Sequence, residues 1–533
     1  MVFDTILRGG TVVDGTGKPG FLADVGIVNG KIAAVGNLAC AQAEMTLDVT
    51  GKLVTPGFID IHRHADAAIF REGFGDAELF QGLTTIVNGN CGLSVSPSGG
   101  AFRQEIFDYL TPVTGALEER MQTETMAGYL QAVRSLQLPL NIGMLVGGGT
   151  VRAQAAGFGV QRLEEEHYKA IHKALEQALS NGALGVSLGL GYAPECFYTT
   201  EELIRALSPL ANSGIPITVH MRQEGSGVED ALREMIEVCK ALHTPVEISH
   251  LKSIGKANWR RSTPNMLRML QEAREDGAEI FADAYPYTAG STQLIHILPS
   301  ECQEGGLDVL SENLKKPEFR AQIRRRMETG SDFENISLLV GWENIVASSV
   351  TKPEHKCYEG KSIAEIAAMQ GKDPFDCAFD LLADEHCAVS MIDFITAEED
   401  IEGILRDKTT CIISDSTYPT QGLLHPRVYG TFVRLFERYV RARRTIPVEK
   451  AVQKVTGLPA KRLRLEGKGQ IAPGMDADVN VFAVEALHEM GTYAEPRQLA
   501  QGMTHVFVSG RPAILDGQRT AASCGKLLER VKS

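Results

Sequence analysis

Short apolar runs alternate with amphipathic segments through the middle of the chain. Eight such runs lie at residues 53–64, 84–91, 141–147, 185–190, 217–222, 246–252, 279–287 and 410–415. The segments between them have apolar residues at helical spacing, and Thr199 followed by Glu202 is typical of a helix start with a capping box. Strands that alternate with helices eight times predict an α/β fold, a (β/α)8 TIM-like barrel.

Both ends of the chain have the alternating pattern of β-strands instead. Asn29-Gly30 and Ser509-Gly510 each separate two apolar runs and are typical of two-residue hairpin turns. The simplest explanation is a small β-sandwich-like domain built from residues 1–56 and 470–533, with the barrel at 57–469. The stretch from Tyr287 to Thr410 is too long for one barrel connection, so we expect an insertion within about 299–408 that covers the mouth.

Composition and charge exclude several classes of protein. The 533 residues carry a formal charge of −14, which argues against a nucleic-acid partner or an anionic membrane surface. Apolar runs are too short for a transmembrane helix, and the first residues lack the pattern of a signal peptide. Ten scattered cysteines without a CxxC pair argue for a reducing setting, so we expect a cytoplasmic protein.

Polar residues that end the apolar runs are the candidates for chemistry, because barrel active sites lie at the carboxyl ends of the strands. His62 and His64 end the first run and point to the same face of a strand. His220 and His250 end the fifth and sixth runs. One such histidine is more often a structural residue, but four of 13 histidines at three strand ends indicate a metal site.

Two further residues occupy the same kind of position. Cys91 ends the second run, where a buried cysteine is usually only a small apolar side chain. Beside four histidines, however, its thiolate would be a good zinc ligand. Asp415 ends the eighth run, where a carboxylate is commonly a helix N-cap. Facing a metal site, it would instead serve as a general base.

Motifs along essentially the whole chain resemble the D-aminoacylase (N-acyl-D-amino-acid deacylase) family of the amidohydrolase superfamily. The matching segments are PGFIDIHRHAD (56–66), GLTTIVNGNCG (82–92), GALGVSLGLGY (182–192), ITVHMRQEG (217–225), EISHLKS (247–253), YPYTAGST (285–292), IISD (412–415), HPRVYGTF (425–432) and IAPGMDADVNVF (471–482). The resemblance implies a tightly held zinc on Cys91, His220 and His250, and a weaker second metal site at His62 and His64.

The resemblance also implies the reaction, the hydrolysis of N-acyl-D-amino acids to a carboxylate and a free D-amino acid, with Asp415 as the catalytic base. Lys252, with Tyr285 and Ser291, is expected to hold the substrate α-carboxylate, and Arg427 to help; alone, Lys252 could equally be a solvated charge at the rim. The segment TQLIHILP that follows Ser291 has no Arg or Lys for a second carboxylate. Apolar D-residues are therefore expected over D-glutamate or D-aspartate.

Two positions depart from the family pattern, and two rival functions follow from the motifs. Gly148 stands where many relatives have His, and Ser416 where Gly is usual. A cyclic-amide hydrolase of the dihydropyrimidinase or dihydroorotase type would share the histidines and Asp415, but the fourth apolar run lacks the lysine that bridges two metals in such enzymes. A catalytically silent scaffold would usually have lost ligands, and this chain keeps them.

Overall fold

Parallel strands from the middle of the chain form the frame of the molecule. A computed structural model describes residues 2–330 and 333–530. The parallel strands are β6 (Phe58–Asp60), β7 (Leu83–Asn88), β8 (Asn141–Met144), β9 (Val146–Gly147), β10 (Val186–Gly189), β11 (Ile217–His220), β12 (Val246–Ile248), β13 (Ile280–Ala284) and β17 (Cys411–Ile412). Each pairs with the next, apart from β8 and β9, which are one run interrupted at Leu145. A parallel bridge between Arg63 and Ser416 joins the last segment to the first.

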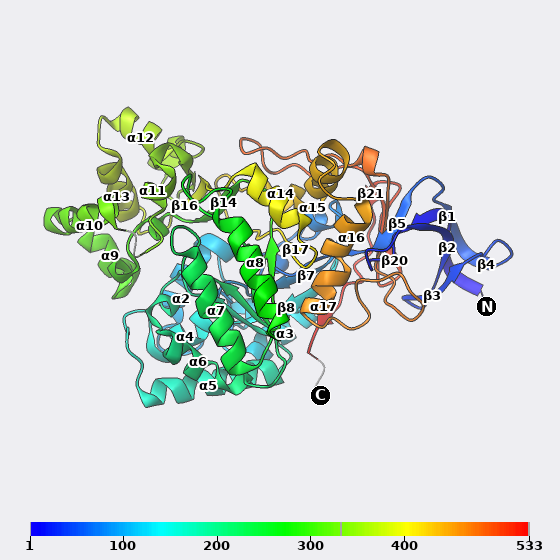
Figure 1. Cartoon of the computed structure of the whole chain (residues 1–533), viewed down its shortest axis with the longest axis horizontal. Helices are drawn as coiled ribbons and strands as arrows, with labels where there is room; N and C mark the ends of the chain where they lie inside the picture. The colour runs from blue at the N-terminus through cyan, green and yellow to red at the C-terminus, as the bar shows by residue number, and fades with distance from the viewer. Residues whose placement is uncertain (1, 331–332, 531–533) are drawn as a thin grey trace.

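Helices follow the strands, and several helices that are consecutive in the chain pack against each other (Figure 1). They are α1 (Asp76–Leu79), α2 (Arg103–Thr114), α3 (Met126–Arg134), α4 (Gly148–Ala156), α5 (Glu165–Ser180), α6 (Thr200–Ala206), α7 (Val228–Leu242), α8 (Ser262–Glu275), α14 (Glu398–Arg406), α15 (Arg427–Arg434), α16 (Val448–Val455) and α17 (Gly457–Arg462). The predicted capping box is confirmed at α6, where Thr199 and Glu202 bond each other's backbone N–H. No helix in residues 2–330 and 333–530 is long and apolar enough to cross a membrane.

Strands from both chain ends share one sheet. They are β1 (Val2–Val12), β2 (Phe21–Val28), β3 (Lys31–Gly36), β4 (Gln42–Asp48), β5 (Leu53–Pro56), β18 (Val479–Phe482), β19 (Met503–Val508), β20 (Arg511–Leu515) and β21 (Gln518–Arg519). The antiparallel pair β5–β18 joins the two ends. Both predicted hairpin turns are confirmed, because Asn29-Gly30 and Ser509-Gly510 all have positive φ and connect paired strands.

The end of the chain leaves this sheet, which differs from the predicted domain boundary. Strand β22 (Leu527–Leu528) pairs in parallel with β8 of the central frame. Gly525 makes the approach to β8 close, since a Cβ there would lie 2.1 Å from the Leu140 carbonyl oxygen. A two-residue strand has no periodicity that a sequence pattern could reveal.

A separate lobe interrupts the frame between β13 and α14. It holds a three-stranded antiparallel sheet, β14 (Ala289–Gln293), β15 (Ile345–Ser349) and β16 (Ser390–Phe394), and the helices α9 (Gly306–Asn313), α10 (Pro317–Thr329), α11 (Ile336–Val340), α12 (Ile363–Gln370) and α13 (Pro374–Asp384). Helices α9–α13 lie at one end of the molecule and β1–β4 at the other (Figure 1). The insertion thus begins before the predicted residue 299, because the small, polar strand AGSTQ has no apolar run to mark it.

Candidate metal centre

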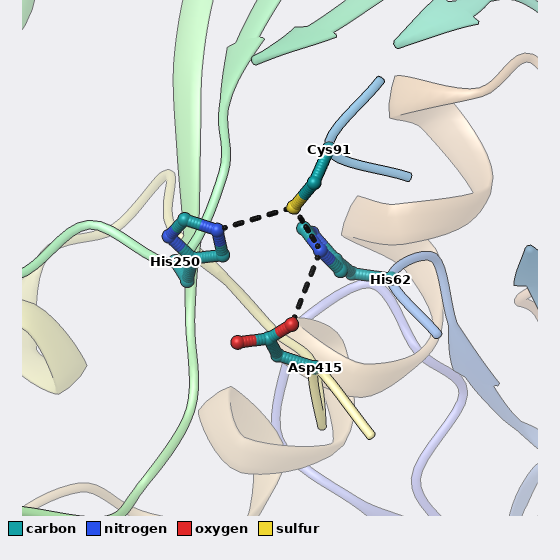
Figure 2. Close-up of side chains that lie close together, drawn as sticks. All are labelled: His62, Cys91, His250 and Asp415. Carbon is teal, nitrogen blue, oxygen red and sulfur yellow. Dashed lines mark hydrogen bonds and ion pairs between the residues drawn. The ribbon is translucent and has the colours of Figure 1, made fainter. Parts of the chain in front are cut away.

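The residues predicted to bind metal and the predicted catalytic base converge at the carboxyl ends of the parallel strands. His62 and His64 follow β6, Cys91 follows β7, His250 follows β12 and Asp415 follows β17. Figure 2 shows Cys91 between two imidazoles, with its Sγ 3.2 Å from His62 Nε2 and 3.4 Å from His250 Nε2. Asp415 Oδ1 lies 3.4 Å from His62 Nε2 and 3.3 Å from His64 Nε2.

His220 joins the cluster from β11. Its Nδ1 lies 3.1 Å from His250 Nε2. Ligand atoms within 4.8 Å of one another form two groups that share His250: His62, Cys91, His250 and Asp415 in one, and His220, Glu224 and His250 in the other.

The spacing and chemistry of these atoms fit zinc. Bond lengths of about 2.0 Å to nitrogen and 2.3 Å to sulfur give a tetrahedron with edges of about 3.3–3.5 Å. The distances from Cys91 to the two imidazoles, and between His220 and His250, match or lie close to those edges. A thiolate with imidazoles and a carboxylate is a donor set that zinc accepts in proteins.

The backbone turns sharply at three of the site residues. Cys91, His250 and Asp415 have φ values of 54°, 39° and 52°, in the left-handed region that side chains other than glycine seldom adopt. Hydrogen bonds hold these turns: Asp415 N–H donates to the His62 carbonyl at 2.9 Å, and His250 N–H to Asp283 Oδ1 at 2.5 Å. These hydrogen bonds stabilise a backbone conformation that costs free energy in residues other than glycine.

Two carboxylates that the sequence interpretation missed brace His250. Glu224 Oε1 lies 2.9 Å from His250 Nδ1 and accepts a hydrogen bond from Lys252 Nζ at 2.6 Å. Asp283, in β13, accepts from the His250 backbone and has its other oxygen 3.9 Å from His62 Nδ1. Both lie at or just beyond a strand end, and this position was the sequence signal that could have identified them. A carboxylate on Nδ1 fixes the ring so that Nε2 is free for a metal.

Burial keeps the imidazoles neutral. It lowers the pKa of His62 to about 4 and holds the pKa of His220 and of His250 well below the usual value. Neutral rings offer a lone pair to a cation at neutral pH. Burial also raises the pKa of the Cys91 thiol well above its usual value, so Cys91 needs a cation to become a thiolate.

Asp415 is held as a carboxylate by its surroundings. Burial alone would raise its pKa, but the Arg427 guanidinium and the hydrogen bond with His64 hold that pKa well below its usual range. Arg427 Nη1 lies 3.0 Å from Asp415 Oδ2, and Nη2 donates to the Ser291 carbonyl at 3.1 Å. Arg427 is fully buried behind Asp415, and the described lining of the pocket does not include it.

A pocket of about 300 Å³ opens onto the centre. The predicted substrate-binding residues Lys252, Tyr285 and Ser291 line it, together with the predicted centre residues His64, Cys91, His220, His250 and Asp415. Apolar side chains such as Leu190 and Phe197 form other parts of the wall. Leu298 and Ile336, which belong to the insertion, also line the pocket.

The two positions that depart from the family pattern have local explanations. A Cβ on Gly148 would lie 2.4 Å from Glu195 Oε1, so the Glu195 carboxylate takes the space of a side chain there. Glu195 Oε2 accepts a hydrogen bond from Gly189 N–H at 2.7 Å. Ser416 Oγ donates to Ser414 Oγ at 2.8 Å, so the hydroxyl is used within the strand-end segment.

Known proteins resemble this chain along most of its length. A model of the amidohydrolase family matches residues 45–514. A D-aminoacylase from Alcaligenes xylosoxydans xylosoxydans is 33% identical over 99% of this chain and 98% of its own length. An N-acyl-D-glutamate deacylase from the same organism is 31% identical over 95% of this chain and 93% of its own.

Solved structures agree too. The crystal structure of an N-acyl-D-glutamate deacylase from Bordetella bronchiseptica, complexed with zinc and a phosphonate inhibitor, has a TM-score of 0.84 at 29% identity, covering 99% of this chain and 100% of that one. A D-hydantoinase from Ralstonia pickettii, in contrast, matches only 16% of this chain and 20% of its own length, at 38% identity.

Proposed function

This chain belongs to the amidohydrolase family and within it to the D-aminoacylases, and on that premise we propose that it is a metal-dependent hydrolase of N-acyl-D-amino acids. The products are a carboxylate and a free D-amino acid. The observation that carries the proposal is the cluster of Cys91, His250, His62 and Asp415, because all of these except His62 line a pocket that Lys252 also lines. Relatives with N-acyl-D-amino-acid deacylase activity match almost the whole chain, whereas the hydantoinase match is short.

The metal is zinc in this proposal. Cys91, His220 and His250 would hold one ion tightly, and His62 and His64 would form a weaker second site beside Asp415. Bound there, zinc would polarise the scissile carbonyl and acidify a water molecule. Two distances support the tight site: His250 Nε2 lies 3.4 Å from Cys91 Sγ and 3.1 Å from His220 Nδ1. His250 is the residue that the two groups of donor atoms share.

The chain's own residues then move the proton. Asp415 accepts a proton from the attacking water at its carboxylate and delivers it to the nitrogen of the departing amine. Arg427 keeps Asp415 ionised for the first of these steps. Glu224 holds the His250 ring by its Nδ1, which keeps the ligand atom directed at the centre.

Substrate binding uses other residues that line the same pocket. Lys252, Tyr285 and Ser291 would hold the α-carboxylate, with Arg427 contributing its charge from behind Asp415. The apolar wall around Leu190 and Phe197 supports a preference for apolar D-side chains such as those of leucine, methionine, phenylalanine and valine.

The proposal includes the finer architecture. The ring of paired strands is taken to be a (β/α)8 barrel with the lobe as its insertion, and the shared terminal sheet to be β-sandwich-like. The cytoplasmic setting and the lack of a nucleic-acid or membrane partner stay predictions.

One screen tests the function. The purified protein is offered N-acetyl derivatives of methionine, leucine, phenylalanine and valine in both D and L forms, and its metal content is measured on the same sample. We expect hydrolysis of the D forms by zinc-containing protein. Turnover of hydantoin or dihydrouracil without any of the D substrates would establish the cyclic-amide rival, and metal-free, inactive protein would support the scaffold.

A further inference from the structure

Among the side chains that line the pocket, carboxylates outnumber lysines and arginines. Three cations line it, and each is paired with a carboxylate: Arg222 with Glu234, Lys252 with Glu224, and Arg326 with Glu301. Five carboxylates line it: Glu224, Glu301, Glu334, Asp393 and Asp415. Two of the five have a buried oxygen without a hydrogen-bond partner in the described part of the chain, namely Asp393 Oδ1 and Glu334 Oε1.

Asp393 lies close to Tyr285, one of the predicted substrate-binding residues. It lies in β16, directly opposite Gly290 of β14, and its relative exposure is only 2%. A Cβ on Gly290 would lie 2.9 Å from Asp393 Oδ1 and 3.3 Å from Tyr285 Oη. Because Gly290 has no side chain, there is space at the wall of the pocket for both the Asp393 carboxylate and the Tyr285 hydroxyl.

Glu334 adds a second carboxylate from the insertion, in the segment before α11. Its Oε2 accepts hydrogen bonds from the backbone N–H groups of Glu224 and Gly225, while Oε1 has no such partner in the described part of the chain. Burial raises the pKa of Asp393 to about 6 and of Glu334 to about 7. Both are therefore predominantly ionised at pH 8.

A substrate with one carboxylate and a substrate with two meet this pocket differently. The α-carboxylate is common to all N-acyl-D-amino acids and has Lys252 as its expected partner. A second carboxylate would meet Asp393 or Glu334, and repulsion between like charges in a partly buried site is strong. An uncharged amide of the same shape would feel no such repulsion.

We propose that Asp393, assisted by Glu334, is a specificity-determining residue that excludes N-acyl-D-amino acids with a side-chain carboxylate and admits their uncharged isosteres. This inference rests on the proposed function and narrows its substrate class. Sequence identity to relatives does not decide between neutral and acidic substrates, because a D-aminoacylase and an N-acyl-D-glutamate deacylase match this chain almost equally well.

The isosteric pair N-acetyl-D-glutamine and N-acetyl-D-glutamate tests the proposal. At pH 8 the native enzyme should favour the glutamine substrate by about 100-fold in kcat/KM, the effect of one like charge at close range. Asp393→Asn keeps the shape and removes the charge, so it should reduce that ratio by about 10-fold or more, mainly by improving the glutamate substrate. Glu334→Gln should reduce the ratio less, because its carboxylate is partly satisfied by backbone donors.

Controls separate this result from other causes. Asp108→Asn, an exposed change on α2 outside the pocket, should leave the ratio unaltered. If Asp393→Asn does not fold, Glu334→Gln alone decides. An unchanged ratio in the folded variants, or an equal fall of KM for both substrates, would overturn the inference while the proposed function stands. If the native enzyme hydrolyses no N-acetyl-D-amino acid at all, both fall together.

Discussion

At the scale of single residues, Asp415 is the side chain whose chemistry depends most on its neighbours. It is buried, it touches both histidines of the first strand end, and its other oxygen is paired with Arg427. The guanidinium keeps it ionised in a place where burial would otherwise favour the neutral acid. A base that is ionised and close to the metal ligands is what amide hydrolysis requires.

Asp415→Asn should therefore lower kcat by about 10²–10⁴-fold, because the amide has nearly the same shape and accepts no proton. The tightly bound metal should remain, since Cys91, His220 and His250 are unchanged. Steady-state kinetics and metal analysis on the same preparation check both parts. Near-native kcat in a variant with its metal intact would remove Asp415 from the role of base.

Asp393 and Glu224 show why residue-level prediction from sequence is incomplete. Glu224 lies beyond the end of its strand, and Asp393 lies in the insertion, on a strand that no apolar pattern marks out from a barrel segment. Their roles arise from contacts with His250, Lys252 and the pocket, which no local pattern encodes.

At the scale of secondary-structure elements, the junction between β10 and α4 depends on one small residue. Gly148 is the first residue of α4, and the Glu195 carboxylate from the loop after β10 fills the space beside it. That carboxylate also accepts the Gly189 N–H at the end of β10. A helix start and a strand end are thus joined through the Glu195 side chain, which would have to shift to admit a Cβ at position 148.

Gly148→Ala should destabilise the protein by about 1–3 kcal/mol, the usual result of crowding a packed site. Gly403→Ala is the matched control, because Gly403 lies inside helix α14 and a Cβ added there would meet no atom within 4 Å. It should be neutral or gain up to about 1 kcal/mol from helix propensity. Denaturant unfolding measures both, and equal stability of the two variants would contradict the packing argument.

At the scale of the whole molecule, the centre ties together distant parts of the chain. The proposed ligands come from the ends of β6, β7, β11 and β12, with Asp415 after β17. A metal that binds only the folded arrangement stabilises it by mass action, by about 4 kcal/mol at a thousandfold excess over Kd. Removing the metal should therefore loosen the frame as well as stop turnover.

Chelation should lower Tm, and Cys91→Ala should lose both the tightly held zinc and activity. His62→Ala should keep the tight zinc, because only the weaker second site loses its ligand. Cys239→Ala, a buried cysteine on α7, is the control for loss of a cysteine outside the centre and should keep the metal. Metal analysis and thermal unfolding test these expectations. Full zinc occupancy in Cys91→Ala would show that Cys91 is not a ligand of the tight site.

The sequence was sufficient for the elements and for the residues that end them. Periodicity located the parallel strands, two dipeptides located the hairpins, and polar residues after apolar runs located His62, Cys91, His250 and Asp415. These features are local, since a strand's alternation and a turn's positive φ depend on a few neighbouring residues. The pairing of strands such as β22 and β8, in contrast, brings together chain segments that are hundreds of residues apart. The ionised state of Asp415, the bracing of His250 and the charge of the pocket were likewise decided by tertiary packing, because burial and the approach of distant charges set the energy of each group.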